Sequence, residues 1–236
     1  MATSHTRTAL ITGASRGLGL ALARQLAREG WILVVDARGI QELEEARREL
    51  ARATTVIAIP GDITDPAHRQ ALTRAVQEIG SLDALINNAS ILGPSPQPPL
   101  LEYPLNILEQ VYRTNTIAQL ALIQLLGRFI PPGGCIINIT SDAAVEAYAG
   151  WGGYGSSKAA LEQLSRILAV ENPQWRIYWV DPGDMRTQMH QQAFPGEDIS
   201  DRPLPEVSVP GLLALLNGTY PSGRYQARAL STGTTQ

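Results

Sequence analysis

The segment Thr12-Gly13-Ala14-Ser15-Arg16-Gly17-Leu18-Gly19 joins a short apolar run to a stretch with helical spacing. The apolar run covers residues 8–12, and the helical stretch continues from Leu18 to Glu29. Glycines at a strand-to-helix turn let the backbone approach a pyrophosphate, which the N-terminus of the helix then stabilises. Glycine also serves ordinary tight turns, so the interpretation depends on the position of this turn at the start of a βαβ unit. That position favours a dinucleotide-binding site.

The rest of the chain repeats this order of strand and helix. The runs that predict strands are Thr8–Thr12, Trp31–Asp36, Thr54–Ile59, Leu82–Ile86, Cys135–Thr140 and Trp175–Asp181. The stretches with apolar residues at i, i+3 and i+4, which predict helices, are Leu18–Glu29, Gln41–Arg52, Pro66–Ile79, Leu105–Phe129 and Ser156–Val170. This alternation predicts an α/β fold, a single Rossmann-type domain over residues 1–236, with a doubly wound, mostly parallel sheet and helices on both faces. We expect about seven strands, the last one at residues 222–225.

Two segments interrupt the alternation. Residues 91–104 contain five prolines, and residues 182–205 are also rich in proline and glycine, which predicts loops rather than helix or central strand. Both follow strands and therefore leave the sheet at its carboxyl edge, where open α/β proteins bind ligands. We expect residues 91–104 and about 184–205 to form the walls of a substrate site; the alternative is that they are simply long connections.

The composition excludes several classes of protein. The chain has 236 residues, a net charge of −3 and 44% hydrophobic residues, so it is globular and lacks the basic surface that nucleic acid requires. No apolar run approaches the ~20 residues of a membrane span, and residues 1–7 lack the apolar stretch of a signal peptide, so we expect a cytoplasmic protein without a membrane partner. The single Cys135 excludes an internal disulfide and a multi-cysteine metal site, and no metal is expected.

One lysine stands out among the basic residues. Of 19 basic residues 18 are arginine, and the exception is Lys158, in the segment Tyr154-Gly155-Ser156-Ser157-Lys158. Near the start of a helix, residues i and i+4 share a face. A fixed positive charge lowers the pKa of a phenol from ~10, which would suit Tyr154 to acid–base catalysis. The same pattern also arises by chance as a pair on a helix surface.

Together these segments resemble the short-chain dehydrogenase/reductase family, whose glycine fingerprint is T-G-x-x-x-G-x-G and whose catalytic helix carries Y-x-x-x-K. The resemblance implies that Tyr154 is the general acid/base and that Lys158 tunes its pKa and binds the cofactor ribose. Ser141, thirteen residues before Tyr154, would polarise the substrate carbonyl, unless it merely caps a strand end. Asn115 would hold a water that links Lys158 to solvent.

The resemblance also implies a cofactor. In the family the acid that selects NAD falls at Ala37 rather than at Asp36, whereas Arg16 and Arg38 occupy positions where basic residues accompany NADP. We therefore expect NADP(H) rather than NAD(H); the alternative is that both arginines are solvated surface groups. The residues expected to bind the cofactor are Gly13, Ser15, Arg16, Gly17, Leu18, Gly19, Arg38, Asp62, Ile63, Asn88, Ala89, Tyr154, Lys158, Pro182, Gly183, Met185 and Thr187.

Two positions depart from the family pattern. Ser90 replaces the last glycine of N-N-A-G and adds a side chain near the cofactor, and Tyr178 replaces an asparagine, which we expect to alter packing rather than chemistry.

The resemblance therefore predicts an NADP(H)-dependent oxidoreductase that acts on a carbonyl or secondary alcohol. The alternatives are a non-catalytic NADP-binding sensor or scaffold, and a family member that catalyses elimination or epimerisation. Residues 91–103, 143–153 and 188–205 would form the substrate walls, and their composition favours a mostly apolar carbonyl compound of modest size. We also expect a homodimer or homotetramer assembled through the fourth and fifth helices.

Overall fold

A parallel sheet organises the chain. The computed structural model describes residues 6–231. The segment 1–7, in which we expect no signal peptide, therefore lies mostly outside the described residues. Within this range the sheet has seven strands in the order β3-β2-β1-β4-β5-β6-β7, and each neighbouring pair is parallel. The strands are β1 (Thr8–Ile11), β2 (Ile32–Ala37), β3 (Val56–Pro60), β4 (Ala84–Asn87), β5 (Cys135–Ile139), β6 (Arg176–Asp181) and β7 (Gly223–Gln226). The predicted Rossmann-type fold is confirmed.

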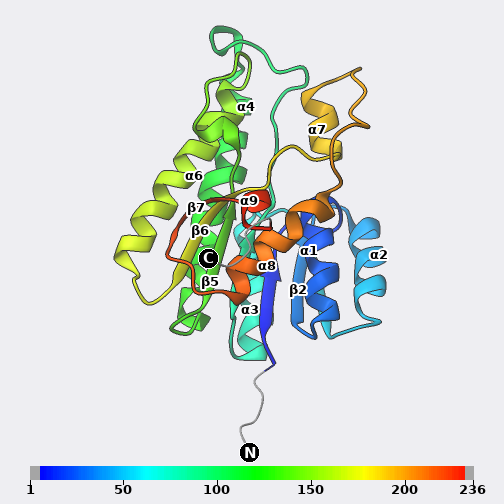
Figure 1. Ribbon diagram of the computed structural model, residues 1–236, viewed down its shortest axis with the longest axis vertical. Helices are drawn as coiled ribbons and strands as arrows, with labels where there is room; N and C mark the ends of the chain where they lie inside the picture. The colour runs from blue at the N-terminus through cyan, green and yellow to red at the C-terminus, as the bar shows by residue number, and fades with distance from the viewer. Residues whose placement is uncertain (1–5, 232–236) are drawn as a thin grey trace, which may run out of the picture.

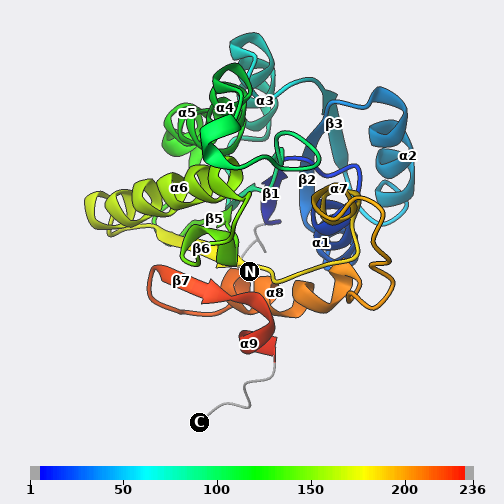
Figure 2. The same cartoon turned by 90° about the horizontal axis from the view of Figure 1, so that it is seen from above.

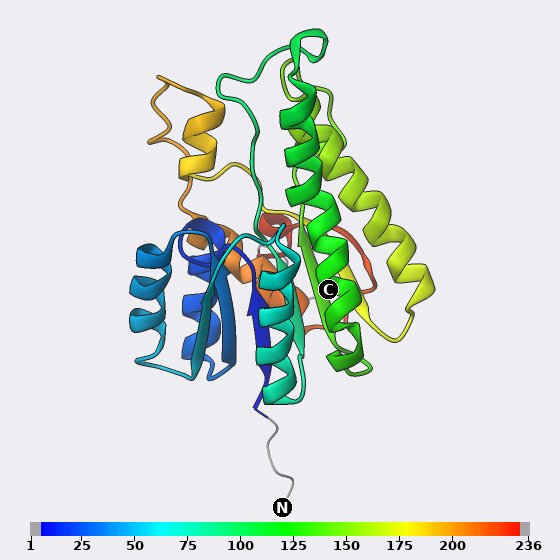
Figure 3. The same cartoon turned by 180° about the vertical axis from the view of Figure 1, so that it is seen from behind.

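Helices cover both faces of this sheet, as Figures 2 and 3 show. The helices α1, α2 and α8 lie on one face, and α3, α5 and α6 lie on the other. The α-helices are α1 (Gly17–Arg28), α2 (Ile40–Leu50), α3 (Pro66–Ile79), α4 (Leu105–Tyr112), α5 (Ala118–Leu126), α6 (Gly152–Glu171), α7 (Gln188–Ala193), α8 (Val209–Asn217) and α9 (Ala227–Ser231). The short 3-10 turns are η1 (Leu100–Glu102), η3 (Gly127–Phe129), η4 (Asp142–Ala144) and η5 (Pro205–Ser208).

The alternation of side chains along β1 divides the core in two. Leu10 packs in the cluster beneath α3 and α5, whereas Ile11 packs in the cluster beneath α1, α2 and α8. Both side chains are fully buried. Because both faces of the sheet are covered, the strands are almost continuously apolar, which is why the sequence located them within two residues. The sheet order reverses between β1 and β4, and this is where ligands bind in open α/β folds.

The predicted helix Leu105–Phe129 is wrong as a single element. The structure divides it into α4, a π turn over Arg113–Ile117 (η2), α5 and η3. The predicted helix Ser156–Val170 begins earlier, at Gly152, since its first turn is rich in glycine and gives no helical signal. Those glycines are needed for close contacts, because a Cβ on Gly153 would lie 2.3 Å from the ring of Tyr103.

The two predicted loops contain short helices. Residues 91–104 include η1, and Leu92 and Tyr103 in this segment are buried, so the segment is not wholly a surface loop. Residues 184–205 include α7, which begins where the Thr187 hydroxyl accepts a hydrogen bond from the His190 N–H at 3.2 Å. Figure 1 shows α4, which directly follows the first segment, and α7 projecting beyond the same edge of the sheet, so both segments border that edge.

Tyr178 serves packing, as expected. Its side chain is fully buried in β6, its hydroxyl donates to the Tyr220 carbonyl at 2.8 Å, and its ring meets Tyr225 edge-on at 5.7 Å. These contacts attach β7 and the chain before it to β6. Cys135 is also buried, and burial raises the pKa of its thiol to about 12. None of the described helices has the length and apolar character needed to cross a membrane.

Candidate active site

A large cleft lies at the carboxyl edge of the sheet. Its volume of about 1460 Å³ exceeds the ~300–1,000 Å³ usual for one small ligand, so it has room for a cofactor and a substrate. All the predicted cofactor residues line this cleft except Gly19, which packs beneath the glycine turn, where a Cβ would lie 2.5 Å from the Gly13 carbonyl oxygen. Of the predicted catalytic residues, Ser141, Tyr154 and Lys158 line the cleft and Asn115 does not.

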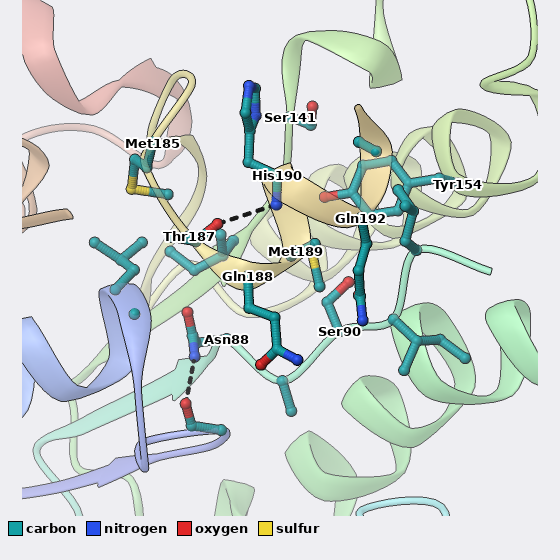
Figure 4. A pocket seen from close by; sticks show the side chains of 18 of the residues that line it. Asn88, Ser90, Ser141, Tyr154, Met185, Thr187, Gln188, Met189, His190 and Gln192 are labelled. Carbon is teal, nitrogen blue, oxygen red and sulfur yellow. Dashed lines mark hydrogen bonds between the residues drawn. The ribbon is translucent and has the colours of Figure 1, made fainter. Parts of the chain in front are cut away.

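The glycine turn is held in place by side chains from two neighbouring strands. Gly13 and Gly17 have φ angles of 67° and 56°, which side chains other than glycine rarely adopt. The Asn88 amide donates to the carbonyl oxygens of Thr12 and Gly13 at 2.8 and 3.1 Å, and Figure 4 marks one of these bonds by a dashed line. In return, the Thr12 hydroxyl accepts hydrogen bonds from the N–H groups of Asn88 and Ala89, both at 2.9 Å. Hydrogen bonds within the protein therefore hold the turn in this conformation.

Asp36 also holds this turn. One oxygen of its carboxylate accepts a hydrogen bond from the Gly13 N–H at 2.8 Å, and the other lies 2.9 Å from Nε2 of His68. The side chain is buried, and burial raises its pKa, while the His68 contact acts in the opposite direction. This role of Asp36 could not be predicted from the sequence, because no local pattern pairs it with Gly13 or His68.

Two exposed arginines lie at this end of the cleft. Arg16 directly precedes the second glycine of the turn, Arg38 follows β2, and both line the cleft. Arg16 also donates a hydrogen bond to the Gln188 side chain in α7, so the glycine turn and the helix above the edge of the sheet are in contact. Nearby, one Asp62 oxygen accepts hydrogen bonds from the N–H and the hydroxyl of Thr64 at 2.8 and 2.7 Å.

Tyr154 and Lys158 lie one turn apart on α6, as the spacing predicts. The Lys158 ammonium nitrogen lies 5.6 Å from the centre of the Tyr154 ring and donates to the Ile139 carbonyl at 2.8 Å. Both side chains are buried. Burial lowers the pKa of Lys158 to about 7 and raises that of the Tyr154 phenol, while a hydrogen bond with the Ser90 hydroxyl lowers the latter.

Burial thus acts on the pKa of Tyr154 in the direction opposite to the effect expected of Lys158. Both groups are desolvated, and a lysine with a pKa of about 7 carries only part of its charge at neutral pH. That Lys158, when charged, lowers the pKa of Tyr154 stays a prediction.

Ser141 lies two residues after the end of β5 and caps η4. Its hydroxyl donates to the Asp142 carboxylate at 2.7 Å and accepts from the Ala143 N–H at 3.2 Å. The capping role weighed in the sequence analysis is thus present. Ser141 also lines the cleft, so the two roles are compatible if its hydroxyl turns from Asp142 toward a ligand.

Asn115 is fully buried in the π turn, and its side-chain amide is saturated with hydrogen bonds. Its oxygen accepts from the Ser90 hydroxyl at 3.0 Å and from the Ile91 N–H at 2.9 Å. Its nitrogen donates to the Ile91 carbonyl at 2.9 Å and to the Ser157 hydroxyl at 3.0 Å. Asn115 therefore joins the segment after β4 to α6, and Ser90 extends this connection into the cleft, where Figure 4 shows Ser90 and Tyr154 in one wall.

Comparisons with known proteins agree with this geometry. Residues 7–198 match the family described as short chain dehydrogenase. The chain belongs to the short-chain dehydrogenase family. It is 34% identical over 177 residues to 1-deoxy-11-beta-hydroxypentalenate dehydrogenase of Streptomyces arenae, which covers 72% of this chain but only 62% of that protein's length.

Solved structures resemble this short-chain dehydrogenase over nearly its whole length. A putative short chain dehydrogenase from Pseudomonas syringae superposes with a TM-score of 0.88 at 31% identity, covering 94% of each chain. A putative short chain dehydrogenase from Shigella flexneri, solved in complex with NADP, superposes with a TM-score of 0.84 at 27% identity, covering 94% of this chain and 97% of that one.

In this short-chain dehydrogenase, the part of the cleft beside Tyr154 is mostly apolar and aromatic. Trp151 lies 5.9 Å from the Tyr154 ring and 6.0 Å from the Phe194 ring, and Leu92 and Met189 complete the wall. The polar side chains of Ser90, His190 and Gln192 also line this part of the cleft (Figure 4). All three predicted wall segments contribute residues. Among residues 6–231, no cluster of three or more His, Cys, Asp or Glu side chains is arranged to hold a metal ion.

Proposed function

We propose that this short-chain dehydrogenase transfers a hydride between NADP(H) and a carbonyl or secondary alcohol, with Tyr154 as the general acid/base. The observation that carries the proposal is one continuous cleft with the glycine turn and two arginines at one end and Ser141, Tyr154 and Lys158 at the other. The structural relative solved with NADP supports this choice of cofactor.

The residues present fit a dinucleotide cofactor that carries a pyrophosphate and a 2′-phosphate. A Cβ on Gly13 would lie 3.0 Å from the Ala89 Cα, so glycine keeps this turn open. The helix α1 begins without a side-chain cap at Arg16, which leaves its first N–H groups free to receive an anion. The glycine turn and α1 would hold the pyrophosphate, and Arg16 and Arg38 would hold the 2′-phosphate.

The remaining cofactor residues follow the cleft toward Tyr154. Asp62 and Ile63 would hold the adenine, and Asn88, Ala89 and Lys158 would hold the nicotinamide ribose. The segment with Pro182, Gly183, Met185 and Thr187 would hold the carboxamide. All of these residues line the cleft.

The chain's own groups supply the proton chemistry. When bound, NADPH supplies the hydride that reaches the carbonyl carbon. Tyr154 donates its phenolic proton to the carbonyl oxygen and is left as phenolate, and Ser141 donates a hydrogen bond to the same oxygen. Lys158, when protonated, favours the phenolate. In alcohol oxidation the proton passes in the opposite direction, from the alcohol to the phenolate.

In this proposal, Asn115 contributes to the proton path between Lys158 and solvent through its backbone and not through its side chain. Its side-chain amide uses all of its hydrogen-bonding positions within the protein. A water that links Lys158 to solvent would therefore contact the backbone of the π turn, where the i→i+4 hydrogen-bonding pattern is interrupted.

The direct test is consumption of NADPH with a panel of ketones, aldehydes, quinones and β-ketoacyl thioesters. We expect turnover of apolar carbonyl compounds of modest size, with one NADPH consumed per alcohol formed. NADPH binding without turnover of any member would favour a sensor or scaffold. Conversion without net consumption of NADPH would favour elimination or epimerisation.

Self-association through α4, α5 and α6 is part of the proposal. Leu105 in α4, Ile117 in the π turn and Val170 in α6 are 73%, 58% and 81% exposed, which is costly for large apolar side chains in water. We expect light scattering to give the mass of a dimer or tetramer. Ile117→Asp and Val170→Asp should shift that mass toward the monomer; an unchanged mass would contradict this interface.

A further inference from the structure

Three consecutive residues at the end of β5 are each bonded to a different charged side chain. The Ile139 carbonyl accepts from Lys158 at 2.8 Å, and the Thr140 hydroxyl donates to Glu162 at 2.8 Å. The Ser141 carbonyl accepts from Nη2 of Arg224 at 3.2 Å. Two of these charged groups, Lys158 and Glu162, come from α6, and the third comes from β7 at the edge of the sheet. The segment that ends in Ser141 is therefore held by two separate elements.

Arg224 joins this segment to two further parts of the site. Its Nε donates to the Glu162 carboxylate at 3.0 Å, which attaches it to α6, the helix that carries Tyr154. Its Nη2 lies 3.7 Å from the Asp181 carboxylate at the end of β6. The other oxygen of Asp181 accepts from the Gly183 N–H at 2.8 Å, so the contact continues into the Pro182-Gly183 turn.

The burial of the two carboxylates that contact Arg224 indicates that the geometry of these contacts is closely defined. The side chains of Glu162 and Asp181 are 4% and 6% exposed, and buried carboxylates are retained only where they are paired and hydrogen-bonded. A guanidinium can donate in several fixed directions at once, whereas an ammonium is a compact point charge. Neither Arg224 nor Glu162 lines the cleft, so any effect on chemistry must pass through Ser141, α6 or the Gly183 turn.

We propose that Arg224 is a positioning residue that fixes the backbone of Ser141 and the Gly183 turn relative to the helix that carries Tyr154. It lies beyond the residues 7–198 that match the family, so this part of the site belongs to the end of the described chain. The inference rests on the proposed function, since it assigns Arg224 an effect on hydride transfer to a substrate polarised by Ser141.

The first test compares Arg224→Met, Arg224→Lys and the double variant Arg224→Met/Glu162→Gln. A displacement of ~1 Å in an active site costs ~10²-fold in rate, so we expect kcat to fall by about ten- to a hundred-fold in Arg224→Met. Arg224→Lys should recover only part of this loss. The double variant removes the charges of Arg224 and Glu162 together, so Glu162 is not left buried and unpaired, and it should keep the fold if Arg224→Met alone does not. Arg47→Met, which removes an exposed pair with Glu44 in α2, is the matched control.

A double-mutant cycle with Ser141→Ala separates positioning from general destabilisation. If Arg224 acts mainly through Ser141, Arg224→Met should reduce kcat by less than about threefold in the Ser141→Ala background, because groups that act as a unit are not additive. An equal loss in both backgrounds would overturn the proposal. Full turnover in Arg224→Met/Glu162→Gln would also overturn it, since Arg224 would then only balance the charge of Glu162.

Hydrogen exchange resolved by residue tests the inference without turnover. In the cofactor-free protein, Arg224→Met/Glu162→Gln should accelerate exchange of two amides relative to Arg47→Met. They are the Gly183 amide, which bonds to Asp181, and the Ala143 amide, which bonds to the side chains of Ser141 and Asp142. Unchanged exchange at both amides would overturn the proposal even if the enzyme is active. Faster exchange in a protein that reduces no carbonyl would support the structural inference while contradicting the proposed function.

Discussion

The Asp36 carboxylate, near the end of β2, accepts a hydrogen bond from the Gly13 N–H at 2.8 Å and so helps to hold the glycine turn. His68 lies 2.9 Å from the other oxygen, so each oxygen already has a partner within the protein. Arg16 and Arg38 remain exposed beside the same turn. The site therefore presents positive charge, and not a free carboxylate, where a 2′-phosphate would bind.

Loss of Arg38 should weaken NADPH binding selectively. A hydrogen bond to a charged group contributes ~1.5–3 kcal/mol, so Arg38→Ala should raise the Kd for NADPH about 10- to 100-fold. The Kd for NADH, which lacks the phosphate, should change little. Fluorescence titration of both cofactors measures this, with Arg48→Ala in α2 as the control. Equal Kd values for NADPH and NADH in the unmutated protein would contradict the assignment.

The burial of Lys158 should appear in the pH dependence of stability. Its pKa falls from 10.5 to about 7 on folding, so the unfolded chain binds more protons between these values. The cost of burying the lysine is therefore largest near and below pH 7 and diminishes as the pH rises toward 10.5.

Lys158→Met should consequently stabilise the cofactor-free protein at pH 7. Each pKa unit corresponds to ~1.4 kcal/mol, so the gain should reach a few kcal/mol, less the lost hydrogen bond to Ile139, and should shrink at pH 9. Urea unfolding at both pH values measures the difference. A difference that is the same at pH 7 and pH 9 would show that the lysine remains charged in the folded protein.

The Ser90 hydroxyl should set the pH range of alcohol oxidation. When its proton turns from Asn115 to the phenolate, it lowers the pKa of Tyr154, so Ser90→Ala should raise that pKa. Oxidation requires the phenolate, and its rate falls as the pH drops through the pKa of Tyr154. The fall should therefore move to higher pH in Ser90→Ala and stay near its original position in Ser90→Thr, which keeps the hydroxyl. Superimposable pH profiles of kcat/KM for Ser90→Ala and the unmutated protein would refute this role.

The sequence predicted those parts of the fold that depend on local patterns. Buried parallel strands give continuous apolar runs, so β1 to β6 lie within two residues of their predicted positions. The break between α4 and α5 was missed because residues 113–117 contain no proline or glycine to mark the π turn.

The candidate site shows the same division between local and long-range patterns. The glycine turn and the Tyr154–Lys158 spacing are local, and the structure places them at one cleft. The contacts of Asp36 with His68 and of Glu162 with Arg224 join residues 32 and 62 positions apart, which no periodicity encodes. The raised pKa of Tyr154 was missed for a similar reason, since burial depends on the packed fold.

The central claim is that Tyr154 supplies the proton in an NADPH-dependent reduction, and Tyr154→Phe tests it most directly. The substitution removes one oxygen and keeps the ring that packs against Trp151. We predict that the Kd for NADPH stays within about threefold, while kcat for the best carbonyl substrate falls by the ~10²–10⁴ expected on loss of a general acid. A Tyr154→Phe enzyme that binds NADPH normally and retains more than about a tenth of the unmutated kcat would contradict the claim.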